Sequence, residues 1–295
     1  MENKYSRRAA MKKIAGSAAL ITGTSFLASR IQAAEAALGN ELQGKINHSV
    51  CKWCYANIPL EELCVAAKEI GITSIELQGP KEWPIIKKHG LTCAMPWGAG
   101  LGIEKGFNEP QYHDELVKSF SEVIPLASKA GFDKIICFSG NRNGMDDETG
   151  LQNATKGLKR LMKVAEDNKV TMVMELLNSK VNHKDYHCDK TAWGVELCDR
   201  VGSENLKLLY DIYHMQIMEG DVIRTIKDFH PYFAHYHTGG VPGRNEIDET
   251  QELFYPAIMR AIIETGYTGF VGQEFVPSRG NDLASLRQGV EICDV

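Results

Sequence analysis

Four side chains suited to binding a metal stand at the ends of short apolar runs in the second half of the chain. The runs are VTMVMEL, LKLLYD, FAHYH and GFVGQE, and the four residues are Glu175, Asp211, His237 and Glu274. Runs of this kind predict parallel strands, and the C-terminal ends of such strands converge at the mouth of a (β/α)8 barrel, where barrel enzymes carry their active sites. Three carboxylates and one imidazole suit a hard or borderline divalent cation, so the pattern predicts a site for Mn²⁺, Mg²⁺ or Co²⁺.

The joint placement of these residues carries more weight than any one of them. A single strand-ending acid is more often a helix N-cap or a surface group than a ligand. A carboxylate inside a barrel mouth is costly to desolvate unless it is paired or bound to a metal. Three carboxylates gathered around one histidine would repel each other, which favours a shared cation.

Other polar residues follow the same strands. His214 comes three residues after Asp211 and either donates a hydrogen bond to a substrate oxygen or supports the site as a helix-cap residue. His235 lies two residues before His237, so strand periodicity puts both on one side, with His235 one layer deeper as a hydrogen-bonded residue or a further ligand. Arg244 follows the seventh strand and either holds a substrate carboxylate or hydroxyl or lies in a solvated loop.

Aromatic residues are also expected near the mouth. Trp53, Trp97 and Trp193 fall near predicted strand ends or loops. Each can stack on the face of a sugar or belong to ordinary core packing.

The elements needed to position these residues alternate along the chain. The predicted strands are 46–51, 72–77, 91–95, 134–139, 170–175, 206–211, 232–237 and 269–274. The predicted helices are 59–70, 81–89, 111–130, 152–168, 190–201, 220–229, 253–265 and 282–293. Strands separated by helices indicate βαβ units, and eight units predict an α/β fold with a single closed (β/α)8 TIM barrel.

The first residues predict export. Arg7-Arg8 precede a weakly apolar stretch and small residues near 32–36, a pattern that resembles a twin-arginine signal. An amphipathic helix or a membrane anchor is the alternative, although the stretch is short for a stable membrane span. The chain of 295 residues then divides into a signal segment, 1–35, and a barrel, 36–295. The expected location is the periplasm, or the cytoplasm if the signal is not functional.

The net charge and the cysteine content limit which partners and cross-links are expected. The net charge of −5 gives no basic surface, so nucleic-acid binding is not expected. The expected partner is a small-molecule hydroxy-carbonyl or sugar substrate, and whether the chain also forms a homo-oligomer stays open. The eight cysteines do not form a disulfide framework in a chain of this length, although Cys51 and Cys54 form a lone CxxC that could pair.

Several of these motifs together resemble one enzyme family. The stretches Glu175–Asn178, Asn205–Asp221, Val241–Arg244 and Gly272–Glu274 resemble the hydroxypyruvate isomerase family, one of the xylose isomerase-like TIM barrels. The likeness covers about residues 130–280 and is most specific in DIYHMQIMEGD. The residues before 130 match only in barrel pattern.

The resemblance implies roles for the site residues. Glu175, Asp211, His237 and Glu274 would bind the metal, with Glu175 and Glu274 also acting as the acid/base pair. His214 and Arg244 would contact substrate. Typical members carry Gln where this chain has His237, and a histidine there is more similar to the related ketose 3-epimerases.

A metal-dependent reaction follows from this site. The metal would stabilise an enediolate, so that a small hydroxy-carbonyl compound is isomerised, as in hydroxypyruvate to tartronate semialdehyde. Three alternatives stay open, namely a ketose 3-epimerase, a lyase or dehydratase acting on an exported sugar, and a metal-dependent hydrolase similar to endonuclease IV.

Overall fold

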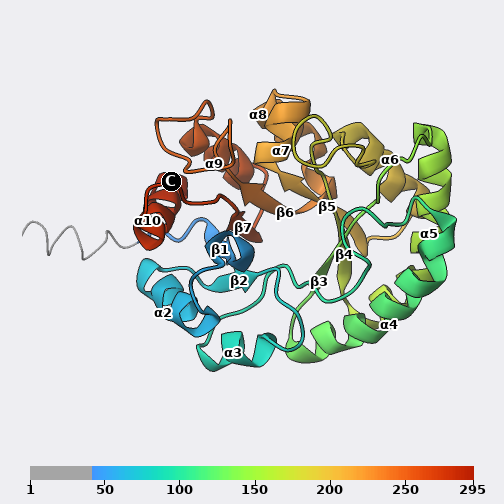
Figure 1. The fold of residues 1–295 in the computed structure, drawn as a ribbon, viewed down its shortest axis with the longest axis horizontal. Helices are drawn as coiled ribbons and strands as arrows, with labels where there is room; N and C mark the ends of the chain where they lie inside the picture. The colour runs from blue at the N-terminus through green and yellow to red at the C-terminus, as the bar shows by residue number, and fades with distance from the viewer. Residues whose placement is uncertain (1–41) are drawn as a thin grey trace, which may run out of the picture. The chain divides into compact units, whose positions relative to one another are not determined.

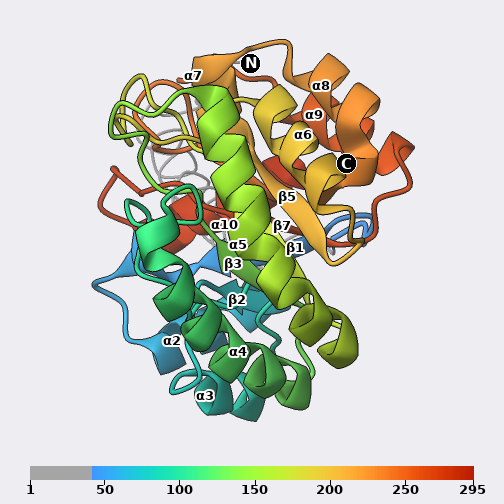
Figure 2. The same cartoon turned by 90° about the vertical axis from the view of Figure 1, so that its right-hand side faces the viewer.

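The computed structural model describes residues 42–295, which form a parallel sheet surrounded by helices. Seven strands are hydrogen-bonded in the order β2-β1-β7-β6-β5-β4-β3. The sheet curls so that its two edges approach each other, and the helices lie around its outside (Figure 1). Seen from the side, helices α4 and α5 run along the outer face of the strands (Figure 2). The predicted α/β barrel is therefore confirmed.

The strands lie close to their predicted positions. They are β1 (Asn47–Cys51), β2 (Ser74–Glu76), β3 (Lys134–Cys137), β4 (Thr171–Glu175), β5 (Leu206–Asp211), β6 (Phe233–Thr238) and β7 (Phe270–Gln273). Most of their residues are buried, as expected for a parallel sheet covered by helices.

The predicted strand at 91–95 is wrong as a regular strand. In the described chain this segment forms one isolated bridge, between Ser74 and Thr92, next to β2. The hydrogen bond that links the following residue to β3 runs from the Ile136 N–H to the Pro96 carbonyl at 3.1 Å. Proline has no N–H to return a bond, so the segment closes the gap between β2 and β3 without a full ladder.

The helices are α2 (Leu60–Ile70), α3 (Trp83–Lys88), α4 (His113–Ala130), α5 (Asp147–Asn168), α6 (Thr191–Val201), α7 (Ile212–Met218), α8 (Val222–Phe229), α9 (Tyr255–Glu264) and α10 (Asp282–Cys293). Two features differ from prediction. Helix α5 begins five residues before the predicted 152, because the Asp146 side chain accepts the Thr149 N–H at 2.8 Å and caps it. Helix α7 was not predicted, and the side chain of Asp211 caps it.

Two predictions concern the termini and the cysteines. The predicted signal segment, 1–35, lies outside the described residues. All eight cysteines are buried and free, so Cys51 and Cys54 do not pair in this structure.

Across residues 42–295, no helix combines the length and the apolar character needed to span a membrane.

Candidate metal centre and active site

The four residues that the sequence singles out meet at one end of the sheet. Glu175 and Asp211 are the last residues of β4 and β5, His237 belongs to β6, and Glu274 directly follows β7. The strand register sets Asp211 beside His237, and His237 beside Gly272. One ligand atom from each of the four residues lies within 4.8 Å of the ligand atoms of the others.

The cluster fits a divalent cation. All four side chains are buried, and the most exposed, Glu175, retains only 4% of its accessible surface. The Nδ1 atom of His237 lies 2.7 Å from Oε2 of Glu274 and 3.5 Å from Oε1 of Glu175. Among the described residues, neither this Nδ1 nor the Oε1 of Glu175 has a hydrogen-bond partner. Buried polar atoms without partners are costly, and a cation held by three oxygens and one nitrogen would satisfy both.

The pKa directions show how crowded the carboxylates are. Burial raises the pKa of Glu175, and it raises the pKa of Asp211 to about 8 against the opposing effect of Arg244. Burial also acts to raise the pKa of Glu274, but Arg244 and His237 hold it well below its usual range. A bound cation would favour the ionised form of all three acids.

Arg244 lies directly beside the predicted ligands. Its Nη2 atom is 2.6 Å from Oε2 of Glu274 and 3.2 Å from Oδ2 of Asp211. Its guanidinium carbon lies 5.1 Å from the ring centre of Trp53 and 5.3 Å from that of Tyr213, within the range of cation–π contacts. The indole N–H of Trp53 donates to Oε1 of Glu274 at 2.7 Å. Arg244 and Trp53 therefore hold Glu274 in place.

His214 presents a hydrogen-bond donor to the same region. Its Nδ1 accepts the backbone N–H of Asn178 at 3.1 Å, so a neutral ring carries its proton on Nε2. Burial, with a smaller effect of Arg244, lowers the pKa of His214 well below its usual value and keeps the ring neutral. Nε2 lies 3.6 Å from Oδ2 of Asp211, and within residues 42–295 it has no hydrogen-bond partner. It is thus free to donate to a substrate oxygen.

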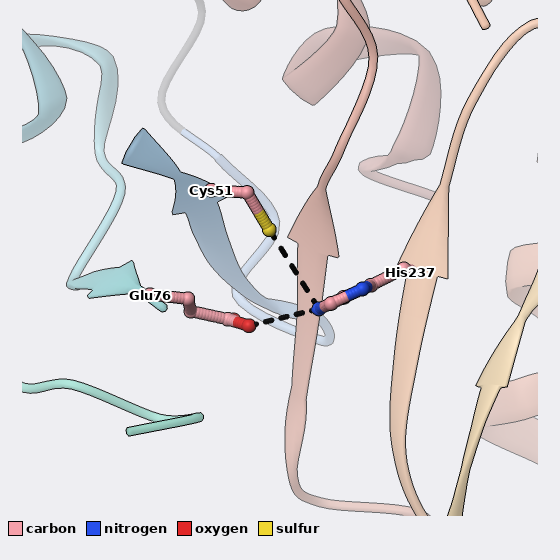
Figure 3. Close-up of side chains that lie close together, drawn as sticks. All are labelled: Cys51, Glu76 and His237. Atoms are coloured by element: carbon pink, nitrogen blue, oxygen red, sulfur yellow. Dashed lines mark hydrogen bonds and ion pairs between the residues drawn. The ribbon is translucent and has the colours of Figure 1, made fainter. Parts of the chain in front are cut away.

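The other nitrogen of His237 faces a second polar group (Figure 3). Its Nε2 lies 3.0 Å from Oε2 of Glu76, the last residue of β2, and 3.7 Å from Sγ of Cys51. The same Glu76 oxygen lies 2.8 Å from Nε2 of His235. His235 is therefore a buried, hydrogen-bonded residue one layer below His237, and it lies outside the four-residue cluster.

A cavity of about 220 Å³ opens over the cluster. It is lined by Trp53, Leu77, Trp97, Ile103, Phe138, Glu175, Leu177, His183, Arg244 and Glu274. Trp97 packs against Phe138 with ring centres 5.3 Å apart. Of the three tryptophans considered from the sequence, Trp53 and Trp97 line this cavity. Trp193 instead stacks on His187 at 4.9 Å.

Sequence reasoning missed four residues of the site: Glu76, Asn178, His183 and Tyr213. Glu76 had a usable signal, because it stands one residue before the end of the predicted strand 72–77, close to where the other acids stand in theirs. Asn178 and His183 lie in the irregular segment after β4, where residue type and spacing do not reveal contacts.

Comparison with known proteins agrees with the fold. Residues 64–294 match the family described as xylose isomerase-like TIM barrel. The chain belongs to this family of barrel proteins. A 2-oxo-tetronate isomerase of Cupriavidus necator is 36% identical over 236 residues, covering 75% of this chain and 88% of that protein. The hydroxypyruvate isomerase of Escherichia coli K12 is 31% identical over 242 residues, covering 75% of this chain and 89% of that one. The chain is, by this kinship, an isomerase.

A solved structure shows the same fold. An AP endonuclease of family 2 from Brucella melitensis superposes with a TM-score of 0.71, covering 82% of this chain and 97% of that one. The two sequences are 24% identical, so the likeness extends to the barrel alone.

Proposed function

We propose that this protein is a metal-dependent isomerase of the aldose–ketose type, acting through an enediolate on a small hydroxy-carbonyl compound such as hydroxypyruvate. The observation that carries the proposal is the convergence of Glu175, Asp211, His237 and Glu274 within 4.8 Å at the end of the sheet. The names of the hydroxypyruvate and 2-oxo-tetronate isomerase relatives support this reaction class. Mn²⁺, Mg²⁺ and Co²⁺ are the cations that suit the ligand set.

The side chains divide the chemistry between them. Glu175 and Glu274 form the acid/base pair: one carboxylate accepts a proton from the hydroxymethyl carbon, and a carboxylic acid returns a proton to the former carbonyl carbon. The hydroxyl proton moves in the same sense, from the hydroxymethyl oxygen to the former carbonyl oxygen, so the isomer forms without gain or loss of atoms. The cation, when bound by the four residues, supplies Lewis-acid stabilisation of the negative charge on the substrate oxygens.

Two further groups would orient the substrate. The free Nε2–H of His214 donates to one oxygen, and the guanidinium of Arg244 faces another from the side of Trp53. The apolar wall of the cavity, which includes Trp97 and Phe138, limits the access of water to the reacting carbons.

Exchange of substrate protons with solvent tests the proposal. Protein lacking residues 1–35 would be incubated in D₂O with Mg²⁺ and, in turn, hydroxypyruvate, tartronate semialdehyde, 2-oxo-tetronate and several ketoses and aldoses. We expect metal-dependent deuterium incorporation beside the carbonyl of one compound and the appearance of its isomer in NMR spectra. Loss of water from the substrate would indicate a lyase or dehydratase instead, and no exchange with any compound would contradict the proposal.

A second candidate is a ketose 3-epimerase, and the cavity wall favours it. Trp97 and Phe138 offer apolar faces of the kind that pack on the C–H groups of a sugar. Among the described residues, Arg244 is the one Lys or Arg side chain lining this cavity, and it is already paired with Glu274. A neutral ketose needs no further cation, whereas a keto acid does. Inversion at the exchanging carbon, with no change in carbonyl position, would identify the epimerase.

We also propose that residues 1–35 direct the protein to the periplasm by the twin-arginine route. The support is the paired Arg7-Arg8 before a weakly apolar stretch. Replacing both arginines with lysine should retain the protein in the cytoplasm, as measured by cell fractionation. A variant that still reached the periplasm would contradict the twin-arginine route, and wild-type protein found in the cytoplasm would contradict export.

A further inference from the structure

His237 has two ring nitrogens, and the fold gives each a different environment. Nδ1 faces the carboxylates of Glu175 and Glu274 at 3.5 and 2.7 Å. Nε2 points the opposite way and lies 3.0 Å from Oε2 of Glu76. Nε2 is within hydrogen-bond distance of Glu76, whereas Nδ1 has no hydrogen-bond partner among the described residues, so a neutral ring is assigned its proton on Nε2. The lone pair of a neutral His237 is then on Nδ1, directed at the proposed cation.

Glu76 is placed to accept hydrogen bonds from two imidazoles. It is fully buried, and its Oε2 also lies 2.8 Å from Nε2 of His235, so two imidazoles from one strand share one oxygen. Cys51 completes the group with its Sγ 3.7 Å from Nε2 of His237, a contact weaker than the one to the carboxylate (Figure 3).

The neighbouring strand leaves room for this arrangement. A Cβ added at Gly272 in β7 would lie 2.9 Å from Cδ2 of His237 and 3.0 and 3.1 Å from the two carboxylate oxygens of Glu76. The backbone of Gly272 does not adopt a positive φ, so the glycine is needed here for space rather than for conformation. The carboxylate of Glu76 and the imidazole of His237 therefore meet in a space that is open because Gly272 has no side chain.

We infer that Glu76 is a positioning residue of the metal centre: it accepts the Nε2–H of His237 and so presents Nδ1 to the cation. The inference rests on the proposed metal-dependent function. Metal-binding histidines commonly donate their second N–H to a carboxylate, which fixes ring orientation and raises ligand basicity. Glu76 has the burial, the distance and the charge for that task, although it lies outside the cluster of predicted ligands.

Metal affinity tests the inference without relying on turnover. Mn²⁺ would be titrated into the wild-type protein, Glu76→Gln and a control variant, with free Mn²⁺ measured by EPR. Glu76→Gln keeps the shape of the side chain but removes its charge. The control is Glu246→Gln, which alters another buried glutamate, one that accepts hydrogen bonds from Ser278 and Ser285 rather than from a predicted ligand.

We expect Glu76→Gln to weaken Mn²⁺ binding roughly 10- to 100-fold, with one site per chain and an unchanged circular dichroism spectrum. Glu246→Gln should bind Mn²⁺ as the wild type does. Equal affinity in the wild type and Glu76→Gln would overturn the role of Glu76 alone. Absence of Mn²⁺ binding by the wild type would overturn the proposed metal centre as well. A second Mn²⁺ bound by the wild type and lost in Cys51→Ser would mean that Glu76 is itself a metal ligand, together with Cys51.

A second measurement needs no variant. In ¹⁵N-histidine-labelled wild-type protein loaded with Zn²⁺, NMR reports which nitrogen of His237 carries the proton and which carries the metal. We expect a protonated Nε2 and a metal-bound Nδ1. Metal on Nε2, or a proton on Nδ1, would overturn the inference even if Glu76→Gln failed to fold.

Discussion

Charge at the centre of this molecule is balanced side chain by side chain. Glu274 is held by Trp53 and Arg244, whereas the Oε1 of Glu175 has no hydrogen-bond partner among the described residues. The two glutamates therefore occupy different environments on one cluster, as carboxylates with distinct tasks often do.

Replacing either glutamate should stop the reaction without unfolding the protein. Glu175→Gln and Glu274→Gln each remove a proton-transfer group and a ligand charge, so we expect turnover to fall by at least 10²-fold. The measurement is deuterium incorporation in D₂O together with the thermal unfolding midpoint, with Glu246→Gln as the control. Full activity in either variant would remove that glutamate from the acid/base pair.

The indole of Trp53 gives a subtler test. Trp53→Phe keeps an aromatic face beside Arg244 but deletes the N–H that donates to Glu274 at 2.7 Å. A hydrogen bond to a charged group contributes about 1.5–3 kcal/mol, so kcat should fall roughly 10- to 100-fold with little change in unfolding temperature. A variant with wild-type kcat would show that this bond does not position Glu274 for catalysis.

Strand ends were the most predictable part of the fold. Each apolar run that stops at Glu175, Asp211 or His237 predicts both a strand and a polar residue near its C-terminal end. In the structure all three residues lie at or next to the C-terminal ends of β4, β5 and β6. The segment 91–95 misled because its composition is that of a strand, while Pro96 prevents a full ladder beside β3. Contacts such as Glu76 to His237 join residues 161 positions apart, and no local pattern encodes such a pairing.

Strand β7 offers a packing prediction. Gly272→Ala would force a methyl group against His237 and Glu76, so we expect about 1–3 kcal/mol of destabilisation and weaker Mn²⁺ binding. Gly79→Ala is the matched control, because its added Cβ would meet its nearest atom at an ordinary 3.4 Å. Urea unfolding and Mn²⁺ titration of both variants measure the effect. Equal stability and equal Mn²⁺ affinity of the two variants would mean that the space beside Gly272 accommodates a methyl group without loss of stability.

His48 in strand β1 makes the free energy of unfolding depend on pH. Burial lowers the pKa of His48 from 6.5 to about 4, and Asp294, 3.9 Å away, offsets this only in part. Between pH 6.5 and 4, His48 binds a proton in the unfolded chain but stays neutral in the folded chain. The free energy of unfolding therefore decreases as the pH falls from 6.5 to 4. The loss is about 3 kcal/mol for a shift of this size.

His48→Asn should remove this part of the acid sensitivity. Urea unfolding at pH 7, 5 and 4 would show a smaller loss of stability in the variant than in the wild type. Parallel losses in the two proteins would show that His48 titrates normally in the folded state.

The barrel as a whole gathers four neighbouring strands around a group of like charges. A cation that binds the folded chain and not the unfolded one stabilises the entire molecule by about 2.7 kcal/mol at 100 times its dissociation constant. For a barrel of this size that amounts to roughly 5–10 °C in the unfolding midpoint.

Chelation should therefore lower the midpoint measured by calorimetry, and Mn²⁺ should restore it. Glu274→Gln, in which a ligand charge is missing, should respond less to both treatments. A midpoint that EDTA and Mn²⁺ leave unchanged would indicate that the cluster is held by Arg244 and His237 without a metal.

We propose that one divalent cation is bound by Glu175, Asp211, His237 and Glu274. A crystal grown with Mn²⁺ and measured at the manganese absorption edge locates the metal directly through its anomalous signal. We predict one strong peak among these four side chains, with the Nδ1 of His237 as its nitrogen ligand. No peak there, or a peak between Cys51 and Glu76 instead, would contradict it.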